Sequence, residues 1–157
     1  MTVIDETADF EILPLETSIG YQIRTTHRLF QRYLQVKIEP YGVSLGMWYF
    51  LRVLWDEDGL TQRELSQRVG TMEPTTLTAI RAMERSGFIR RERQERDRRK
   101  INVYLTPKGR SMRTELLPLA REVVDDAACT MDETERDELL RLLGLIQTNL
   151  VQRLNIG

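Results

Sequence analysis

Residues 87–106 read GFIRRERQERDRRKINVYLT. Ile89 lies before the arginine-rich middle of this stretch, and Ile101, Val103 and Leu105 lie after it, at apolar positions typical of strands. The stretch therefore predicts a β-hairpin with a cationic tip. The cationic residues on its flanks and tip are Arg90, Arg91, Arg93, Arg96, Arg98, Arg99 and Lys100.

Positive charge is concentrated around this predicted hairpin. The whole chain of 157 residues carries 23 Lys and Arg against 24 Asp and Glu. Residues 81–113 alone hold 12 basic and 4 acidic side chains, which leaves 11 basic and 20 acidic side chains elsewhere. A cluster of this kind makes a local positive field that attracts phosphate and releases its counterions. The charge distribution predicts a polyanionic partner.

Two short helices are predicted immediately before the hairpin. Thr61 and Glu64 have the spacing of a capping box, in which each side chain accepts a hydrogen bond from the backbone amide of the other residue. Gly70 then supplies a turn, and we expect Thr71 to cap a second helix that tolerates Pro74 in its first turn. Two short helices joined by one glycine turn indicate a helix-turn-helix.

The second of these helices has two contrasting faces at 100° per residue. The predicted inward face consists of Thr76, Ala79, Ile80 and Met83. The outward face consists of Thr71, Thr75, Thr78, Arg81 and Arg85. It combines short hydroxyls with arginines and contains no glutamate, a composition that suits the floor of a DNA groove. Within the hairpin, we expect Asp97 to pair with a neighbouring guanidinium and fix its direction, as for an arginine presented to a minor groove.

Longer amphipathic helices are predicted towards both ends of the chain. Residues 15–38 place Ile19, Ile23, Phe30, Leu34 and Ile38 on one face, before Pro40 and Gly42 break the helix. Ser44 is expected to cap an apolar helix, Thr106 to cap another, and Asp132 with Glu135 to form a capping box that starts the last helix. The apolar faces of the first and last helices are wider than one small domain covers, which predicts a partner subunit.

The composition excludes several classes of protein. The length and the hydrophobic content of 41% suit a single domain, and no apolar run is long enough to cross a bilayer. Residues 1–16 contain five acids and no basic residue, so we expect neither export nor membrane anchoring. Cys129 is the single cysteine, which excludes an internal disulfide and fits a reducing cytoplasm; we expect it to be a small buried hydrophobe.

The inventory of side chains also argues against catalysis. One histidine and one cysteine form no evident metal cluster or Cys-His pair, and no glycine-rich phosphate loop or G-x-S-x-G elbow is present. We therefore expect no enzyme activity, no metal and no cofactor.

Taken together, these motifs resemble the multiple-antibiotic-resistance regulator (MarR) family of winged-helix transcription factors. The resemblance rests on residues 60–65, 74–78, 83–91, 97–99 and 105–109, and with the flanking helices it covers residues 15–154. It implies a mainly α fold with a small β-hairpin wing: one domain over residues 1–157, a winged helix-turn-helix at 44–106, and dimerisation helices at 15–40 and 107–154. The family often has arginine where this chain has Thr78.

The resemblance also implies the partners of the protein. It predicts a homodimer that binds a pseudo-palindromic operator in double-stranded DNA, acts as a repressor, and is released by a small effector, such as an aromatic carboxylate or its coenzyme A thioester. The predicted DNA-binding residues are Gln62, Arg63, Thr71, Thr75, Leu77, Thr78, Arg81, Arg96, Asp97, Arg98 and Arg99. The predicted effector-binding residues are Arg24, His27, Trp48, Tyr49 and Arg52.

Two alternatives stay open at this point. One is a regulator that responds to oxidation through Cys129. The other is a winged helix that docks only onto protein and does not bind DNA, although such a module has no need of so many cations in and around a wing.

Overall fold

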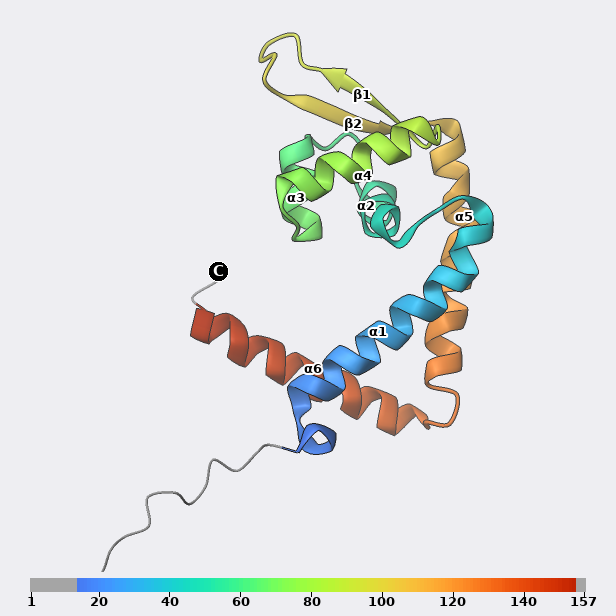
Figure 1. The fold of residues 1–157 in the computed structure, drawn as a ribbon, viewed down its shortest axis with the longest axis vertical. Helices are drawn as coiled ribbons and strands as arrows, with labels where there is room; N and C mark the ends of the chain where they lie inside the picture. Colours follow the sequence, from blue (N-terminus) through green and yellow to red (C-terminus); the bar gives the residue numbers. More distant parts are fainter. Residues whose placement is uncertain (1–13, 155–157) are drawn as a thin grey trace, which may run out of the picture. The chain divides into compact units, whose positions relative to one another are not determined.

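A computed structural model describes residues 14–154 of the chain (Figure 1). The fold is mainly helical with one antiparallel β-hairpin, as the sequence predicts. The α-helices are α1 (Ile19–Ile38), α2 (Leu45–Asp56), α3 (Gln62–Val69), α4 (Glu73–Arg85), α5 (Pro107–Ala127) and α6 (Glu133–Leu154). The strands are β1 (Ile89–Arg93) and β2 (Ile101–Leu105), and the 3-10 turns are η1 (Leu15–Thr17) and η2 (Glu39–Tyr41).

The chain divides between Leu119 and Ala120 into two compact units. In the first unit, fully buried side chains from α1, α2, α3, α4, the hairpin and α5 form one core. Its largest members are Phe88, Ile38, Leu51, Leu54, Leu65, Ile80, Met83 and Leu116. Two tryptophans of α2 meet edge to face, with the ring centres of Trp48 and Trp55 5.8 Å apart. The indole N–H of Trp55 donates to the Gly109 carbonyl at 2.9 Å and so ties α2 to the start of α5.

The first long helix is shorter than the sequence predicts. Residues 15–17 form the 3-10 turn η1, because the Ser18 side chain accepts a hydrogen bond from the Tyr21 amide and starts α1 at Ile19. The helix ends as predicted, with Pro40 in η2 and Gly42 at a φ of 77°. Of the predicted apolar face, only Leu34 and Ile38 are buried in the single chain. Ile19, Ile23 and Phe30 are exposed.

The capping box at the start of α3 is confirmed. The Thr61 amide donates to Glu64 Oε2 at 2.8 Å, and the Glu64 amide donates to Thr61 Oγ1 at 3.2 Å. These hydrogen bonds from Thr61 hold the pKa of the Glu64 carboxyl below its usual range. At the other end of α3, Gly70 forms the expected turn, and it does so in the left-handed conformation at a φ of 73°.

The expected cap of α4 is wrong. Met72 occupies the N-cap position without a side-chain hydrogen bond, and α4 begins at Glu73. Thr71 cannot serve as the cap because its hydroxyl lies 2.9 Å from Thr76 Oγ1, one turn into the helix. Pro74 lies in the first turn of α4, as predicted.

A small cluster of hydroxyls lies inside the turn between α3 and α4. Thr76 is only 1% exposed, and its Oγ1 donates to Ser66 Oγ at 2.9 Å. Ser66 in turn donates to the Thr71 carbonyl at 2.8 Å. Every hydroxyl of the cluster therefore has a partner. These bonds offset the cost of removing Thr76 from water, so Thr76 can share the buried face of α4 with Ala79, Ile80 and Met83.

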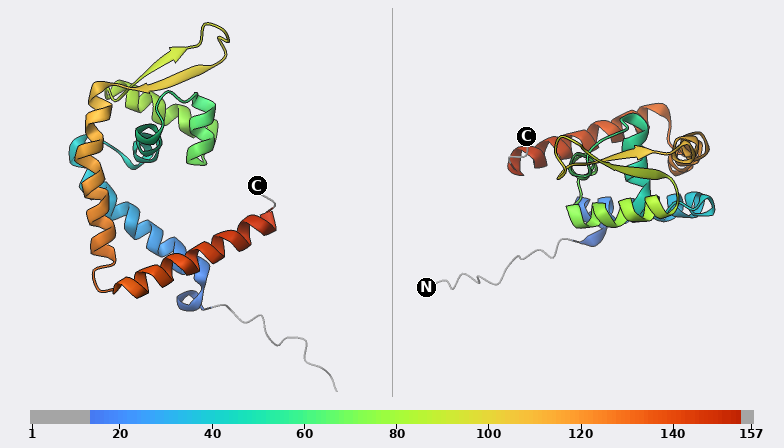
Figure 2. Two further views of the ribbon diagram at one scale, coloured as in Figure 1. Left: turned by 180° about the vertical axis from the view of Figure 1, so that it is seen from behind. Right: turned by 90° about the horizontal axis from the view of Figure 1, so that it is seen from above.

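The hairpin extends alongside α3 and α4 in both views of Figure 2. Its strands pair from Ile89 opposite Leu105 to Arg93 opposite Ile101. The hairpin also packs tightly on the start of α5. A Cβ atom at Gly109 would lie 2.0 Å from the Phe88 carbonyl oxygen, so no other residue fits there without moving the backbone.

The second unit contains the last part of α5 and all of α6. The predicted capping box is confirmed, with the Asp132 amide donating to Glu135 Oε2 at 2.9 Å and the Glu135 amide donating to Asp132 Oδ1 at 2.8 Å. No residue of α6 is buried in the single chain, and Leu140 is 68% exposed. The expectation that Cys129 is buried is wrong, because this residue lies exposed in the turn that follows α5.

Over residues 14–154, none of the helices has the length and apolar character that a bilayer span requires.

The capping box of α3 makes a testable contribution to stability. Because the pKa of Glu64 is lowered in the folded state, its ionised form stabilises the fold above the unfolded pKa of about 4.3, and this stabilisation is lost as pH falls through the folded pKa. We expect Glu64→Gln to lower the free energy of unfolding at pH 7 by about 0.5 kcal/mol. Urea unfolding of wild type and variant at one protein concentration, repeated from pH 7 to pH 3, measures this difference.

The difference should shrink towards zero at the acidic end of the range. The matched control is Glu115→Gln, since Glu115 is exposed on α5 and makes no hydrogen bond or ion pair within residues 14–154. A pH-independent difference for Glu64→Gln, or an equal effect of the control, would contradict the assignment.

Candidate nucleic-acid interface

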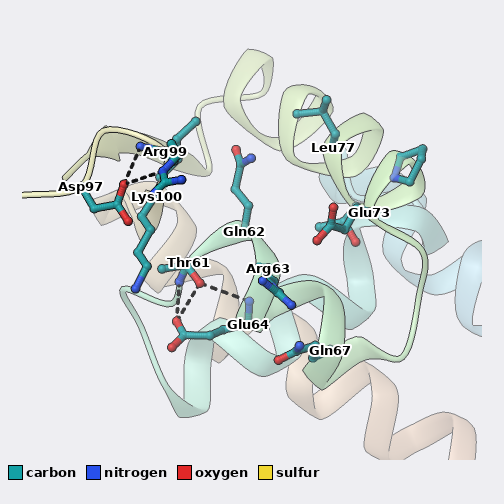
Figure 3. A pocket seen from close by; sticks show the side chains of 13 residues that line it. Thr61, Gln62, Arg63, Glu64, Gln67, Glu73, Leu77, Asp97, Arg99 and Lys100 are labelled. Atoms are coloured by element: carbon teal, nitrogen blue, oxygen red, sulfur yellow. Dashed lines mark hydrogen bonds and ion pairs between the residues drawn. The ribbon is translucent and has the colours of Figure 1, made fainter.

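An open groove of about 890 Å³ lies where α3, the start of α4 and the hairpin tip converge (Figure 3). Gln62 and Arg63 come from α3, Leu77 comes from α4, and Asp97 and Arg99 come from the hairpin tip. The structure therefore brings together five of the residues predicted to contact DNA. The other lining residues are Thr61, Glu64, Gln67, Glu73, Pro74, Thr76, Lys100 and Ile101.

Glu73 is the lining residue least expected from the sequence. It lies in the first turn of α4, beside Pro74 and on the side of Leu77, whereas the outward face of that helix contains no glutamate. A carboxylate in the first turn of a helix is stabilised by the positive end of the helix dipole. An acidic residue at this position in the sequence is therefore a sign that the helix begins there. Its negative charge repels phosphate, and with Glu64 and Asp97 it balances the three cations Arg63, Arg99 and Lys100 in the lining of the groove.

The other predicted contacts on α4 lie outside this groove. Thr75, Thr78 and Arg81 are exposed on the face of α4 opposite the buried residues, as the helical spacing predicts. Thr71 is half-buried and is held by Thr76. Thr78 Oγ1 donates to the Pro74 carbonyl one turn earlier, at 3.1 Å. This bond uses the hydroxyl hydrogen, so Thr78 offers an acceptor oxygen and a methyl group to its surroundings.

The predicted pairing of Asp97 is confirmed, and its partner is Arg99. Asp97 Oδ1 accepts hydrogen bonds from the Arg99 amide at 3.1 Å and from Arg99 Nε at 3.3 Å. The tip is closed by two backbone bonds, from Lys100 N to the Asp97 carbonyl and from Gln94 N to the Lys100 carbonyl, both of 2.9 Å. The Arg99 side chain is 93% exposed even though its Nε is held. Asp97 therefore orients a guanidinium that projects into solvent.

The arginines of the hairpin fall into two groups. At the stem, Arg90 pairs with Glu92 at 2.8 Å and Arg91 pairs with Glu84 at 2.7 Å. The hydrogen bond from Arg91 lowers the pKa of Glu84, which keeps the carboxylate charged. At the tip, Arg96 and Arg98 make no ion pair within residues 14–154. Arg93, at the end of β1, donates to the Arg98 carbonyl instead of pairing with a carboxylate. The sequence alone places these cations in one cluster, but the structure pairs Arg90 and Arg91 with carboxylates at the stem and leaves the guanidinium groups of Arg96, Arg98 and Arg99 exposed at the tip.

The predicted effector-binding residues differ in their exposure in the single chain. Trp48 is 5% exposed and packs against Trp55 in the core, whereas Arg24, His27 and Tyr49 are exposed and Arg52 is half-buried. Within residues 14–154, no hydrogen bond or ion pair joins any two of the five.

A shallow groove of about 330 Å³ lies along α1 and contains none of these five residues. It is lined by Thr25, Arg28, Leu29, Gln31, Arg32, Gln35 and Leu45. Arg28 and Arg32 in its lining lie outside the apolar face predicted for residues 15–38, and no motif in the sequence indicates the groove.

Comparisons with a family model, with known sequences and with solved structures all match the chain to transcriptional regulators. The MarR family model matches residues 43–101, which run from the start of α2 through the hairpin tip. The HTH-type transcriptional regulator MgrA of Staphylococcus aureus is 29% identical over 137 residues, which are 84% of this chain and 89% of MgrA.

Solved structures agree with these sequence matches. The crystal structure of a MarR transcriptional regulator from Methanosarcina mazei Go1 is 34% identical, covers 85% of this chain and 96% of its own, and gives a TM-score of 0.78. The S. aureus MepR–DNA complex shares the fold, with a TM-score of 0.78 at 21% identity over 85% of this chain and 98% of its own. The chain therefore belongs to the MarR family of transcriptional regulators and is not an enzyme.

Proposed function

We propose that the protein regulates transcription by binding double-stranded DNA with α4 in the major groove and the hairpin tip in the adjacent minor groove. The observation that carries this proposal is the pair of Asp97 and Arg99, which holds an exposed guanidinium at a tip beside the groove formed with α3 and α4. Arg96, Arg98 and Arg99 would meet the minor groove or its phosphates, and Thr75, Thr78 and Arg81 would face base edges. The MepR–DNA complex supports the use of this fold for DNA binding.

The proposal includes a homodimer and a two-fold operator. The wide apolar faces of α1 and α6 are exposed in the single chain, which favours their burial against a second copy. Two copies of α4 related by a two-fold axis would read inverted half-sites about 10 bp apart, so the operator would be pseudo-palindromic. Binding at such a site would block transcription, and repression is the mode that we propose.

An effector would act by changing the separation of the two copies of α4. A small molecule shifts such an equilibrium only through unequal affinity for the DNA-binding and released conformations. We propose an aromatic or acidic compound that binds near Arg24, His27, Tyr49 and Arg52. These cationic and aromatic side chains are exposed or half-buried, and therefore accessible in the chain. Trp48 would then support the site from the core instead of touching the ligand.

The first prediction concerns the cations of the hairpin tip. If a dimer neutralises about eight phosphates, the logarithm of DNA affinity should fall against the logarithm of salt concentration with a slope of about −7. Replacing Arg98 and Arg99 with alanine removes four cations per dimer, so the slope should become shallower by about three to four. Fluorescence anisotropy across a salt series, with a duplex selected by the wild-type protein from a random-sequence library, measures both slopes.

The matched control is Arg121→Ala with Arg141→Ala. Both arginines are exposed, pair with carboxylates of their own helices, and lie outside residues 44–106. This control removes the same number of charges and should leave the slope nearly unchanged. A protein that docks only onto other proteins would give no DNA binding in any of these measurements.

The second prediction concerns base selection by Thr78. Because its hydroxyl hydrogen is used by Pro74, Thr78 should favour bases that present a donor or a methyl group, such as adenine, cytosine or thymine, over guanine. Replacing the thymines of a selected half-site with uracil removes their methyl groups. If Thr78 contacts one of them, wild-type affinity should fall about fourfold.

In this experiment Thr78→Ser, which lacks the methyl group, should bind the thymine and uracil duplexes almost equally. Thr78→Val retains the methyl contact and should keep its preference for thymine. Equal discrimination by all three proteins would show that Thr78 does not face a thymine.

The third prediction concerns the effector. Isothermal titration calorimetry of the free protein with a panel of aromatic carboxylates should detect binding by at least one compound, and that compound should weaken DNA binding reciprocally. Arg52→Ala should reduce the affinity for this compound because it removes a charge partner of the carboxylate. An effector whose affinity is unaffected by substitution of Arg24, His27 and Arg52 would have to bind elsewhere.

A further inference from the structure

One side chain of β2 joins the hairpin tip to the segment that precedes α3. Asn102 Nδ2 donates to the Gly59 carbonyl at 2.7 Å, and Asn102 Oδ1 accepts from Gln94 Nε2 at 2.7 Å. Gly59 lies between α2 and α3, and Gln94 follows directly after the end of β1, where the tip begins. The carboxamide therefore uses both its donor and its acceptor to connect two segments that are far apart in the sequence.

Backbone bonds hold the same segment against β2. Val103 N donates to the Leu60 carbonyl at 2.8 Å, and Gly59 N donates to the Val103 carbonyl at 3.0 Å. Thr61, the N-cap of α3, forms an isolated β-bridge with Asn102. The start of α3 is thus fixed to β2, and the Asn102 side chain extends this connection to Gln94 at the tip.

The close approach of the segment around Gly59 to β2 depends on the absence of a side chain at position 59. Gly59 has a φ of 78°, and a Cβ atom there would lie 2.9 Å from Cε1 of Tyr104. The Arg90 guanidinium lies 4.6 Å from the centre of the same ring. Asp58 Oδ1 completes the junction by accepting from the Leu105 amide at 2.8 Å. Asn102 is therefore part of a packed junction in which each of these polar groups has a defined partner.

We propose that Asn102 is a positioning residue for DNA binding: it fixes the hairpin tip relative to α3 and α4, so that Arg98 and Arg99 reach their groove while α4 occupies the neighbouring one. The inference rests on the proposed function, because it assigns a role within the same DNA-binding surface. Without the carboxamide, we expect the tip to be less ordered in the free protein. It would then have to become ordered when DNA binds, and the entropy lost in that step would reduce DNA affinity. Asn102 itself need not touch DNA.

A double-mutant cycle tests this role. Asn102→Ala removes both side-chain bonds, and we expect it to lower affinity for the selected duplex by about fivefold to tenfold. In a protein that already carries Arg98→Ala and Arg99→Ala, the same substitution should change affinity by less than about twofold. The reason is that a tip without these arginines contributes little to DNA affinity, whether it is ordered or not. A purely structural role for Asn102 would not produce this dependence on the tip arginines.

Two further variants keep the test decisive. Gln94→Ala breaks only the tip end of the connection, leaves the bond to Gly59 in place, and should show the same non-additivity in a fold that is less perturbed. Ile38→Val removes one methyl group from a fully buried position on α1. It should lower the melting temperature but leave DNA affinity unchanged with or without the tip arginines.

The outcomes separate the inference from the proposed function. If Asn102→Ala and Gln94→Ala leave affinity unchanged, or lower it equally with and without the tip arginines, the positioning role is overturned while the DNA-binding function stands. If the wild-type protein selects no duplex, or if Arg98→Ala with Arg99→Ala binds as the wild type does, the proposed mode of DNA binding is overturned and the inference with it.

Discussion

The placement of α4 depends on a chain of hydroxyl hydrogen bonds in the turn after α3. The hydroxyls of Ser66, Thr71 and Thr76 bond to one another and to backbone carbonyls, with Ser66 and Thr76 buried and Thr71 half-buried. An unpaired hydroxyl there would cost about 1 to 3 kcal/mol, so these bonds permit only a narrow range of angles between the two helices. The exposed face of α4, the groove beside it and the distance to the hairpin tip all follow from that angle.

Features set by local chemistry could be predicted from the sequence. The capping boxes at Thr61 and Asp132, the cap at Ser44 and the turn at Gly70 depend on neighbours within a few residues, and the structure has each of them. The prediction that Thr71 caps α4 was wrong, because its hydroxyl bonds to Thr76 instead. That bond depends on how α4 packs against Ser66, which neighbouring residues in the sequence do not reveal. The prediction that Cys129 is buried was wrong, because the residue lies in an exposed turn and not on the apolar face of a helix.

The candidate site could be predicted only where its contacts join residues that are close in the sequence. Asp97 and Arg99 are two residues apart, so their ion pair follows from the sequence. The pairing of Arg91 with Glu84 requires α4 and β1 to pack together, and no periodicity indicates it. Glu73 lines the groove only where the hairpin tip lies beside α3 and α4, whereas Gln94 meets Asn102 through the strand register of the hairpin itself. Of these relations, the contact between α4 and β1 decides that the Arg91 guanidinium is paired with a carboxylate.

The pairing of Arg90 and Arg91 with carboxylates, and the exposure of Arg96, Arg98 and Arg99 at the hairpin tip, have a consequence for how the protein meets a partner. With a net charge of −1, the molecule as a whole exerts almost no long-range pull on a polyanion. The field of Arg96, Arg98 and Arg99 extends only over a Debye length, about 10 Å at 0.1 M salt. Attraction of a polyanion by the tip would therefore be short-ranged, and it would favour approaches that bring the tip close to the polyanion.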